Sequence, residues 1–248
     1  MHVVMKKIIG LLCLTFFAAS TFAQDAEEII MRVDNNLSAK SRIVESEMTV
    51  HGRRSSRTIS SKSYTVGNEK SFTEYLSPAR EKGTKMLKLD KEMWLYSPST
   101  DRTIMISGHM LRQSVMGSDL SYEDMMEDRK LTDIYSASLI GEETIEGRVC
   151  YVVQLTAKVN DVAYETQKIW VDTGRFIPLK QELYAKSGQL LKRVVLSDVK
   201  QVSSRWYPMK MIYKDVLKDG KGTEWLITHI EFDKPIQDHI FSKASLKQ

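Results

Sequence analysis

The segment between residues 93 and 126 is the most distinctive part of the sequence. It begins Met93-Trp94-Leu95-Tyr96-Ser97-Pro98 and continues to Met116-Gly117-Ser118-Asp119-Leu120-Ser121-Tyr122-Glu123-Asp124. Its methionines are Met93, Met105, Met110, Met116, Met125 and Met126. Methionine is unbranched and polarizable, so it lines surfaces that accept variable apolar partners. In a chain without a catalytic signature, this cluster favours an apolar binding site over a reaction centre.

The sequence on both sides of this segment alternates between apolar and polar residues with the period of a β-strand. Residues 44–50 and 58–66 precede it, and residues 149–155 and 209–213 follow it. Turn signals such as Gly67-Asn68 separate the strands. About eleven strands at regular spacing predict an antiparallel sheet that curls into an incomplete, half-closed barrel.

One helix is expected before the first strand. Asp25-Ala26-Glu27-Glu28 has the pattern of a capping box. Ile29, Ile30, Val33 and Leu37 follow at helical spacing. The pattern predicts an amphipathic helix that begins at Asp25 and ends between residues 35 and 38.

Residues 109–129 interrupt the strand series with two short helical patterns. The first ends at Gly117, and either Ser118 or Ser121 would cap the second, with Asp124 three residues after Ser121. Apolar residues on these helices fit two arrangements, a plug that only stabilises the barrel or a lid over a binding cavity. Stripes of this kind more often belong to a core, so the residue pattern alone favours the plug.

The beginning of the chain has the pattern of a secretory signal peptide. Lys6 and Lys7 precede the mostly apolar residues 8–19, and Thr21-Phe22-Ala23 is a small-residue ending. A membrane anchor is the alternative, but the apolar run is shorter than the roughly 20 residues that span a bilayer. The pattern predicts cleavage after Ala23, a periplasmic location, and a single domain formed by residues 24–248.

Charge and cysteine content exclude several classes of protein. The chain carries 36 basic and 32 acidic residues, and loss of Lys6 and Lys7 with the leader brings it still closer to balance. This gives no electrostatic case for nucleic-acid binding. Cys150 is the only cysteine after the leader, so no intramolecular disulfide can form. We expect Cys150 to be a small buried hydrophobic residue.

No catalytic motif is present in the sequence. The chain lacks a Gly-x-Ser-x-Gly elbow and a His-x-x-x-His metal pair. His109, with Asp119 and Asp124, is the one candidate acid–base group, and a polar residue at a helix end explains His109 more simply. We therefore expect no enzymatic activity, no metal and no cofactor.

The residues quoted above resemble those of the outer-membrane lipoprotein-sorting (LolA-like) carriers. The resemblance rests on the leader, the single N-terminal helix, the strand at 93–98, Ser77-Pro78 before Gly83-Thr84, and the run at 116–124. This run is similar to one branch in particular, periplasmic proteins associated with inner-membrane lipid exporters of the resistance–nodulation–division type. The resemblance implies a half-barrel with a helical lid over a hydrophobic cavity for acyl chains.

The resemblance changes the interpretation of residues 109–129 from plug to lid. It implies a periplasmic carrier that binds the acyl chains of a lipoprotein or lipid amphiphile and moves it from the inner to the outer membrane. The implied partners are a resistance–nodulation–division exporter and an outer-membrane acceptor. We expect the cavity and lid to contain Met93, Trp94, Tyr96, Met105, Met110, Leu111, Met116, Leu120, Tyr122 and Met125. Asp119 and Asp124 are expected to anchor the lid, with a solvated turn as the alternative.

The sequence does not identify the arginine that holds the lid closed in related carriers. The best-studied lipoprotein carriers of this kind use a strand arginine to hold the lid closed through hydrogen bonds to the lid backbone. Arg80 is near the right region, but it follows Pro78 in a turn, so the role is not assigned to it. The alternative function is a periplasmic stress-sensing regulator that binds a membrane partner. Such regulators usually carry a second domain, for which we expect no room here.

Overall fold

The strands of the protein form one antiparallel sheet. The computed structural model describes residues 18–52 and 55–248. Within them, thirteen strands are arranged in the order β6-β5-β4-β3-β2-β1-β13-β12-β11-β10-β9-β8-β7. Strand β13 pairs with β1 and so joins the strands that precede the mid-chain helices to those that follow them. The expected mainly β half-barrel with an N-terminal helix and short mid-chain helices is confirmed, with thirteen strands in place of about eleven.

Six strands precede the mid-chain helices and seven follow them. The first set is β1 (Ser41–His51), β2 (Ser56–Val66), β3 (Lys70–Ser77), β4 (Lys85–Leu89), β5 (Glu92–Ser97) and β6 (Arg102–Ile106). The second set is β7 (Tyr135–Ile145), β8 (Arg148–Ala157), β9 (Thr166–Asp172), β10 (Pro178–Tyr184), β11 (Leu190–Val202), β12 (Arg205–Asp215) and β13 (Thr223–Phe232). Strands β6 and β7 are the two edges of the sheet.

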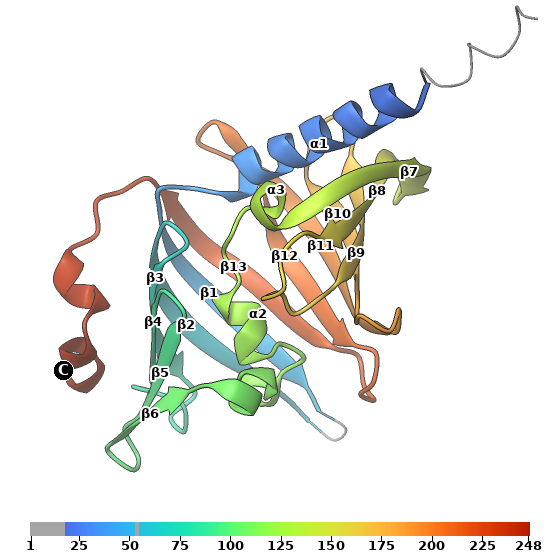
Figure 1. Ribbon diagram of the computed structural model, residues 1–248. Coiled ribbons are helices and arrows are strands. Elements are labelled where there is room, and N and C mark those ends of the chain that lie inside the picture. The colour runs from blue at the N-terminus through green and yellow to red at the C-terminus, as the bar shows by residue number, and fades with distance from the viewer. Residues whose placement is uncertain (1–17, 53–54) are drawn as a thin grey trace, which may run out of the picture.

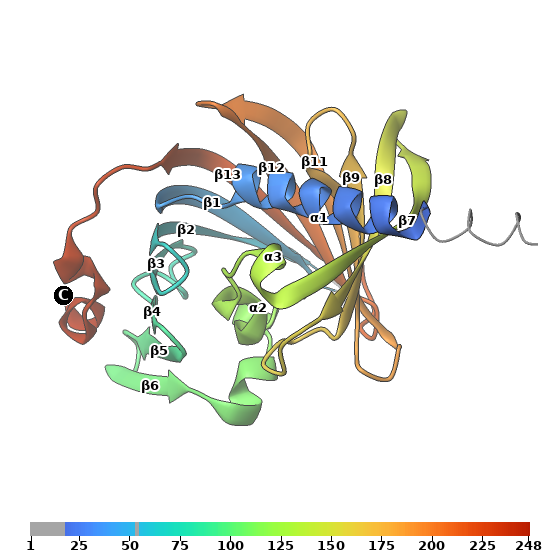
Figure 2. The same ribbon diagram turned by 45° about the horizontal axis from the view of Figure 1, so that its top comes forward.

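The sheet curls around one of its faces, which we call the concave face (Figures 1 and 2). The pairing register shifts between Glu45 and Ser46 and between Leu139 and Gly141, and such irregularities bend and twist a strand pair. The mid-chain helices lie on the concave side (Figure 2). They are η1 (Gly108–Arg112), η2 (Val115–Gly117), α2 (Tyr122–Met126) and α3 (Leu131–Ile134).

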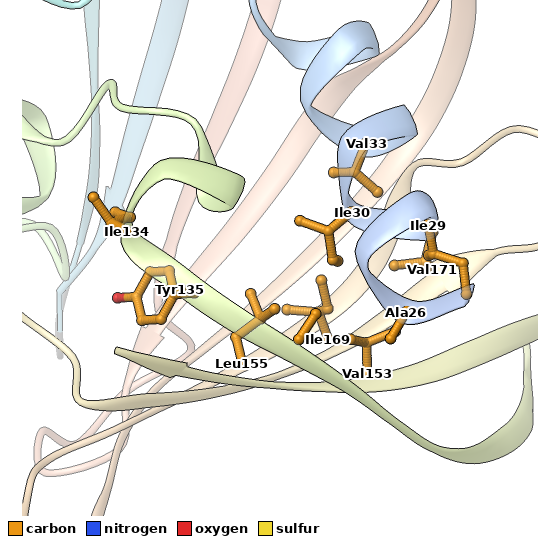
Figure 3. Packing of buried hydrophobic residues seen from close by; sticks show 11 residues of the cluster. Ala26, Ile29, Ile30, Val33, Ile134, Tyr135, Val153, Leu155, Ile169 and Val171 are labelled. Carbon is orange, nitrogen blue, oxygen red and sulfur yellow. The ribbon is translucent and has the colours of Figure 1, made fainter. Parts of the chain in front are cut away.

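Helix α1 (Ala18–Leu37) crosses one end of the curved sheet (Figure 1). Its apolar side chains pack against β7, β8 and β9 in one buried cluster (Figure 3). This cluster includes Ala26, Ile29, Ile30, Val33, Val153, Leu155, Ile169 and Val171. The helix ends within the predicted range, but it begins before Asp25, so the expected capping position lies inside the helix.

Asp34 connects α1 to the mid-chain helices. Its carboxylate accepts hydrogen bonds from the backbone N–H groups of Leu131 and Thr132, each at 2.9 Å. The first amides of a helix have no partner within that helix. A side chain of the N-terminal helix therefore caps α3 and fixes where it starts.

The C-terminal segment covers part of the opposite, convex face. Helices η3 (Asp238–Phe241) and η4 (Lys243–Lys247) lie outside β3, β4 and β5 (Figures 1 and 2). Phe241 and Leu246 pack there against Phe72, Leu87 and Trp94. Strands β3, β4 and β5 are therefore covered on both faces, whereas Ile104 and Met105 of β6 are each 44% exposed.

The predicted signal peptide, residues 1–23, falls mostly outside the described residues, because the description begins at residue 18. Its cleavage after Ala23 stays a prediction. Among residues 18–52 and 55–248, no helix combines the length and the apolar character needed to cross a membrane.

Candidate functional site

The segment of residues 107–134, which we call the lid, covers the concave face with apolar side chains. Toward β4, β5 and β6, Val115 and Tyr122 pack in one cluster with Met86, Met93 and Ile106. In a second cluster, toward β1, β2 and β3, Leu120 packs with Met48, Ile59 and Tyr75. Both clusters also contain Met116 and Met125. The apolar space expected between sheet and lid is thus occupied by the lid's own side chains.

Most of the residues predicted to form the cavity and lid come together in these two clusters. They are Met93, Met110, Leu111, Met116, Leu120, Tyr122 and Met125. Val115, which is 1% exposed, belongs to the same group, although a lone valine in this segment gives no sequence signal for such a position.

Trp94, Tyr96 and Met105 lie on the convex face, which differs from the expectation. Trp94 and Tyr96 share a strand face as predicted, but they pack in the cluster that the C-terminal segment covers. Met105 pairs directly with Trp94 across β5 and β6 and is 44% exposed. Neighbouring residues of a strand point to opposite faces, so Met93 faces the lid and Trp94 faces away from it.

Helix α2 begins with a capping box formed by Ser121 and Asp124. The Ser121 hydroxyl accepts a hydrogen bond from the Asp124 N–H at 3.2 Å, and the Asp124 carboxylate accepts one from the Ser121 N–H at 2.6 Å. Each side chain satisfies a backbone amide that the short helix leaves unpaired. The turn into α2 is therefore fixed by local hydrogen bonds.

Asp124 also joins α2 to the sheet. The Tyr164 hydroxyl donates a hydrogen bond to its carboxylate at 2.5 Å, and Lys192 on β11 forms an ion pair with it. Burial, together with the nearby Asp124 carboxylate, raises the pKa of Tyr164. The phenol consequently stays protonated and remains a donor to Asp124 at neutral pH.

Asp119, which precedes α2, attaches the lid to β12 and β13. Its carboxylate accepts hydrogen bonds from the Thr223 hydroxyl at 2.8 Å and from the Asp215 N–H at 3.0 Å. Its own N–H donates to Thr223 Oγ1 at 2.9 Å. Nearby, Lys218 donates to the carbonyl of Ser118 at 3.0 Å. Asp119 thus contacts β12 and β13 before α2 begins, and Asp124 contacts β11 from the first turn of α2.

Arg57 is a lid contact that the sequence did not reveal. It lies on β2 and donates a hydrogen bond through Nη2 to the carbonyl of Met116. The neighbouring Gly117 has φ of +70°, and a Cβ there would lie 3.4 Å from the same guanidinium nitrogen. Arg80, by contrast, has a side chain that is 85% exposed and is paired with Glu81. Arg57, and not Arg80, is therefore the strand arginine that contacts the lid backbone.

A further polar attachment lies between α2 and α3. The carboxylate of Asp128 accepts a hydrogen bond from Arg42 on β1 at 2.7 Å and from Lys88 on β4 at 3.1 Å. Lys88 also donates to the carbonyl of Met126 at 2.6 Å. The lid is therefore held to the concave face, which we also call the wall, by hydrogen bonds and ion pairs as well as by apolar packing.

Two open pockets, of about 490 and 530 Å³, lie beside the lid. Arg112, Glu123 and Val162 line both of them. The first reaches Lys192, and the second reaches Lys88 and Met126. Solvent thus reaches the lid on two sides, while the lid residues Val115 and Leu120 stay buried, although Leu120 also lines the first pocket.

Two observations concern the metal-binding and nucleophilic side chains that the structure describes. Among residues 18–52 and 55–248, no group of three His, Cys, Asp or Glu side chains could hold a metal ion. Cys150 is a buried free cysteine, as expected, and burial raises the pKa of its thiol. A raised pKa leaves the thiol protonated, which makes it a poor nucleophile.

The curled sheet, the helix across its end and the lid on its concave face define a LolA-like half-barrel. A protein-family model described as "-like: Uncharacterized protein" matches residues 67–248. No curated protein matches the chain. The chain belongs to the family of this model, and its fold is that of the LolA-like proteins.

Solved structures give the same fold over nearly the whole chain. A putative outer membrane lipoprotein-sorting protein domain from Vibrio parahaemolyticus is 24% identical, with a TM-score of 0.78 over 91% of this chain and 100% of that one. A DUF1329 family protein from Desulfovibrio piger is 25% identical, with a TM-score of 0.80 over 91% and 99%. A LolA superfamily protein from Nitrosomonas europaea is 25% identical, with a TM-score of 0.74 over 89% and 98%.

Proposed function

We propose that this protein is a periplasmic carrier that binds the acyl chains of a lipoprotein or lipid under its lid. The proposal is supported most directly by one observation: the apolar side chains on the concave face are covered by a separate segment of short helices, not by a second sheet layer. The likeness to a lipoprotein-sorting protein domain points the same way.

Carriage requires that the cargo can leave again. Burial of an acyl chain stabilises the bound state by about 0.8 kcal/mol per CH₂ group, and a carrier that kept all of this energy would not release its cargo. Here Met116, Leu120 and Met125 of the lid cover the apolar side chains of the concave face. Lid and cargo then compete for the same surface. The free energy of cargo binding is what the cargo gains there minus what the lid loses when it is displaced.

The carrier would take its cargo at the inner membrane and deliver it at the outer membrane. The proposed donor is an exporter of the resistance–nodulation–division type, and the proposed acceptor is an outer-membrane protein. Both follow from the family resemblance of the run at 116–124 and of the strand at 93–98.

A fluorescent fatty-acid titration tests the carrier function with variants of opposite expected sign. Leu120→Ala removes lid packing and should raise the affinity about tenfold or more, because Leu-to-Ala changes in a core cost about 2–5 kcal/mol. Met48→Asp places a carboxylate on the wall and should lower the affinity at least tenfold. Met105→Asp, on the convex face, is the control for an added charge and should leave the affinity unchanged.

The outcomes separate the two parts of the proposal, once circular dichroism and thermal melting have shown that each variant folds. If the wild-type protein binds no amphiphile, it is not a carrier, and the regulatory alternative is favoured. If it binds but Leu120→Ala weakens binding as much as Met48→Asp does, the lid does not compete with the cargo.

A further inference from the structure

Four cationic side chains on the concave face contact the lid. They are Arg42 on β1, Arg57 on β2, Lys88 on β4 and Lys192 on β11. The register places Lys88 opposite Met93 and Arg57 opposite Val50, so these charges stand among the apolar residues that the lid covers. A wall for purely apolar cargo does not require them.

Each of these cations has an anionic or carbonyl partner in the lid. Arg42 and Lys88 share the carboxylate of Asp128, at 2.7 and 3.1 Å. Lys192 pairs with Asp124, and Arg57 with a lid carbonyl. All four cations therefore bond to a segment that the cargo has to displace, and Arg57 also pairs with Glu81 outside the lid, at 3.6 Å.

Lys88 is the most deeply buried of the four cations and is only 2% exposed. The acceptors of its two hydrogen bonds, the Met126 carbonyl and the Asp128 carboxylate, both belong to the lid. A charged group away from water is strongly destabilising unless it is paired. If cargo takes the place of the lid and keeps water away, Lys88 loses both acceptors, and an acceptor on the cargo is needed in their place.

Two cations share one lid carboxylate at this position, and the pocket that Lys88 lines also holds other charges, Glu69, Asp90, Glu123, Glu127 and Asp161 together with Lys91, Arg112 and Arg129. Arg42 and Lys88 contribute two positive charges, and Asp128 contributes one negative charge. A phosphate or carboxylate group presented here would meet two donors arranged to share one acceptor. Such charge-assisted hydrogen bonds are among the stronger polar contacts in proteins.

We infer that the cargo is an amphiphile with an anionic headgroup, a phosphate or a carboxylate, which takes the place of Asp128 between Arg42 and Lys88. This inference rests on the proposed carrier function and names the substrate class of that site. The acyl chain replaces Met116 and Met125, which precede Asp128 in the lid. The lid thus has the same order of groups as the proposed cargo, with apolar side chains followed by an anionic group.

Competition binding with ligands of one chain length tests the headgroup. A neutral fluorescent probe, N-phenyl-1-naphthylamine, is displaced from the full-length protein by 1-palmitoyl glycerol, by palmitate or by palmitoyl lysophosphatidic acid. The two anionic ligands should displace the probe at concentrations about tenfold or more below that of the neutral one. Comparison of palmitate with lysophosphatidic acid tells a carboxylate cargo from a phosphate cargo.

Variants of Arg42 and Lys88 test whether these two residues cause the preference for anionic ligands. Lys88→Met and Arg42→Gln should each reduce the ratio of anionic to neutral affinity toward one, while 1-palmitoyl glycerol still displaces the probe. Asp128→Asn should tighten binding of all three ligands, because it weakens the lid, and should keep the preference. Lys62→Met is the matched control, because Lys62 also pairs with a carboxylate, Glu45 at 2.9 Å, but is partly exposed and away from the lid clusters.

The results separate this inference from the carrier function itself. If none of the ligands displaces the probe, the carrier function fails. If all three displace it equally, the protein binds amphiphiles but the anionic headgroup is wrong. If the preference exists and persists in both folded wall variants, Arg42 and Lys88 do not hold the headgroup, and the inference is overturned. If Lys88→Met does not fold, the ratio of anionic to neutral affinity in Arg42→Gln alone tests the inference.

Discussion

Asp172 shows how a single residue stabilises the half of the sheet on which α1 packs. Its side chain is 1% exposed and accepts hydrogen bonds from Arg148 and Arg175, the latter at 3.0 Å. Backbone N–H groups of Gly174 and Arg175 add two more, at 2.9 and 3.0 Å. Burial alone would raise the pKa of Asp172, but these donors outweigh it and hold the pKa well below its usual range.

The depressed pKa predicts a defined pH dependence of stability. An unfolded aspartate titrates near pH 3.9, so the contribution of Asp172 is fully present above about pH 5 and is lost as the pH falls toward the folded-state pKa. Asp172→Asn should lower the free energy of unfolding at pH 7 by about 2 kcal/mol. Chemical denaturation between pH 7 and pH 3 measures both effects.

Asp198→Asn is a suitable control, because the Asp198 carboxylate is 44% exposed and pairs with Lys200 on the surface. It should change the stability by less than about 1 kcal/mol. The difference between the wild type and Asp172→Asn should narrow as the pH falls. A difference that stays constant down to pH 3 would contradict the role assigned to the ionised carboxylate.

At the scale of the element, the start of α2 depends on its capping box. The helix has only five residues, so its own hydrogen bonds cannot sustain it, and Ser121 and Asp124 supply the missing contacts. Ser121→Ala should destabilise the lid locally by about 1 kcal/mol. Native-state hydrogen exchange of the amides at 121–126 should then be faster by about fivefold.

Ser107 offers a matched control for the loss of a serine hydroxyl. It stands at the N-cap position of η1 but makes no side-chain cap hydrogen bond. Ser107→Ala should leave exchange in the lid unchanged. If Ser121→Ala also leaves it unchanged, the capping box does not determine the order of α2.

At the scale of the whole molecule, the C-terminal segment closes the convex face. Leu246 is fully buried against the strands that carry Phe72, Leu87 and Trp94. Leu246→Ala should lower the free energy of unfolding by about 2 kcal/mol or more. The emission of Trp94 should shift to the red, because its indole ring becomes more exposed to water.

Leu217→Ala is the control, because Leu217 is 63% exposed. It should change neither stability nor emission. If Leu246→Ala leaves stability unchanged, the convex face is sufficiently covered without η4. If it instead changes ligand affinity, the two faces of the sheet are coupled.

The order of the elements and the class of fold were determined by the sequence alone. Strand alternation at 44–50 and 58–66 and the helical spacing at Ile29, Ile30 and Val33 correspond to strands and a helix in the structure. Such periods reflect which side chains must be buried along each element, and that demand is local. The position of the lid between the two strand series could be read in the same way.

The tertiary structure decided which face of each strand meets the lid. Met93 and Trp94 are both buried, so the sequence could not tell the lid-facing residue from its neighbour. Whether Arg57, Lys88 and Lys192 would hold the lid was equally invisible, because their partners lie far away in the chain. Burial is a property of one segment and its period, whereas an ion pair or a shared face depends on where two distant segments come to lie.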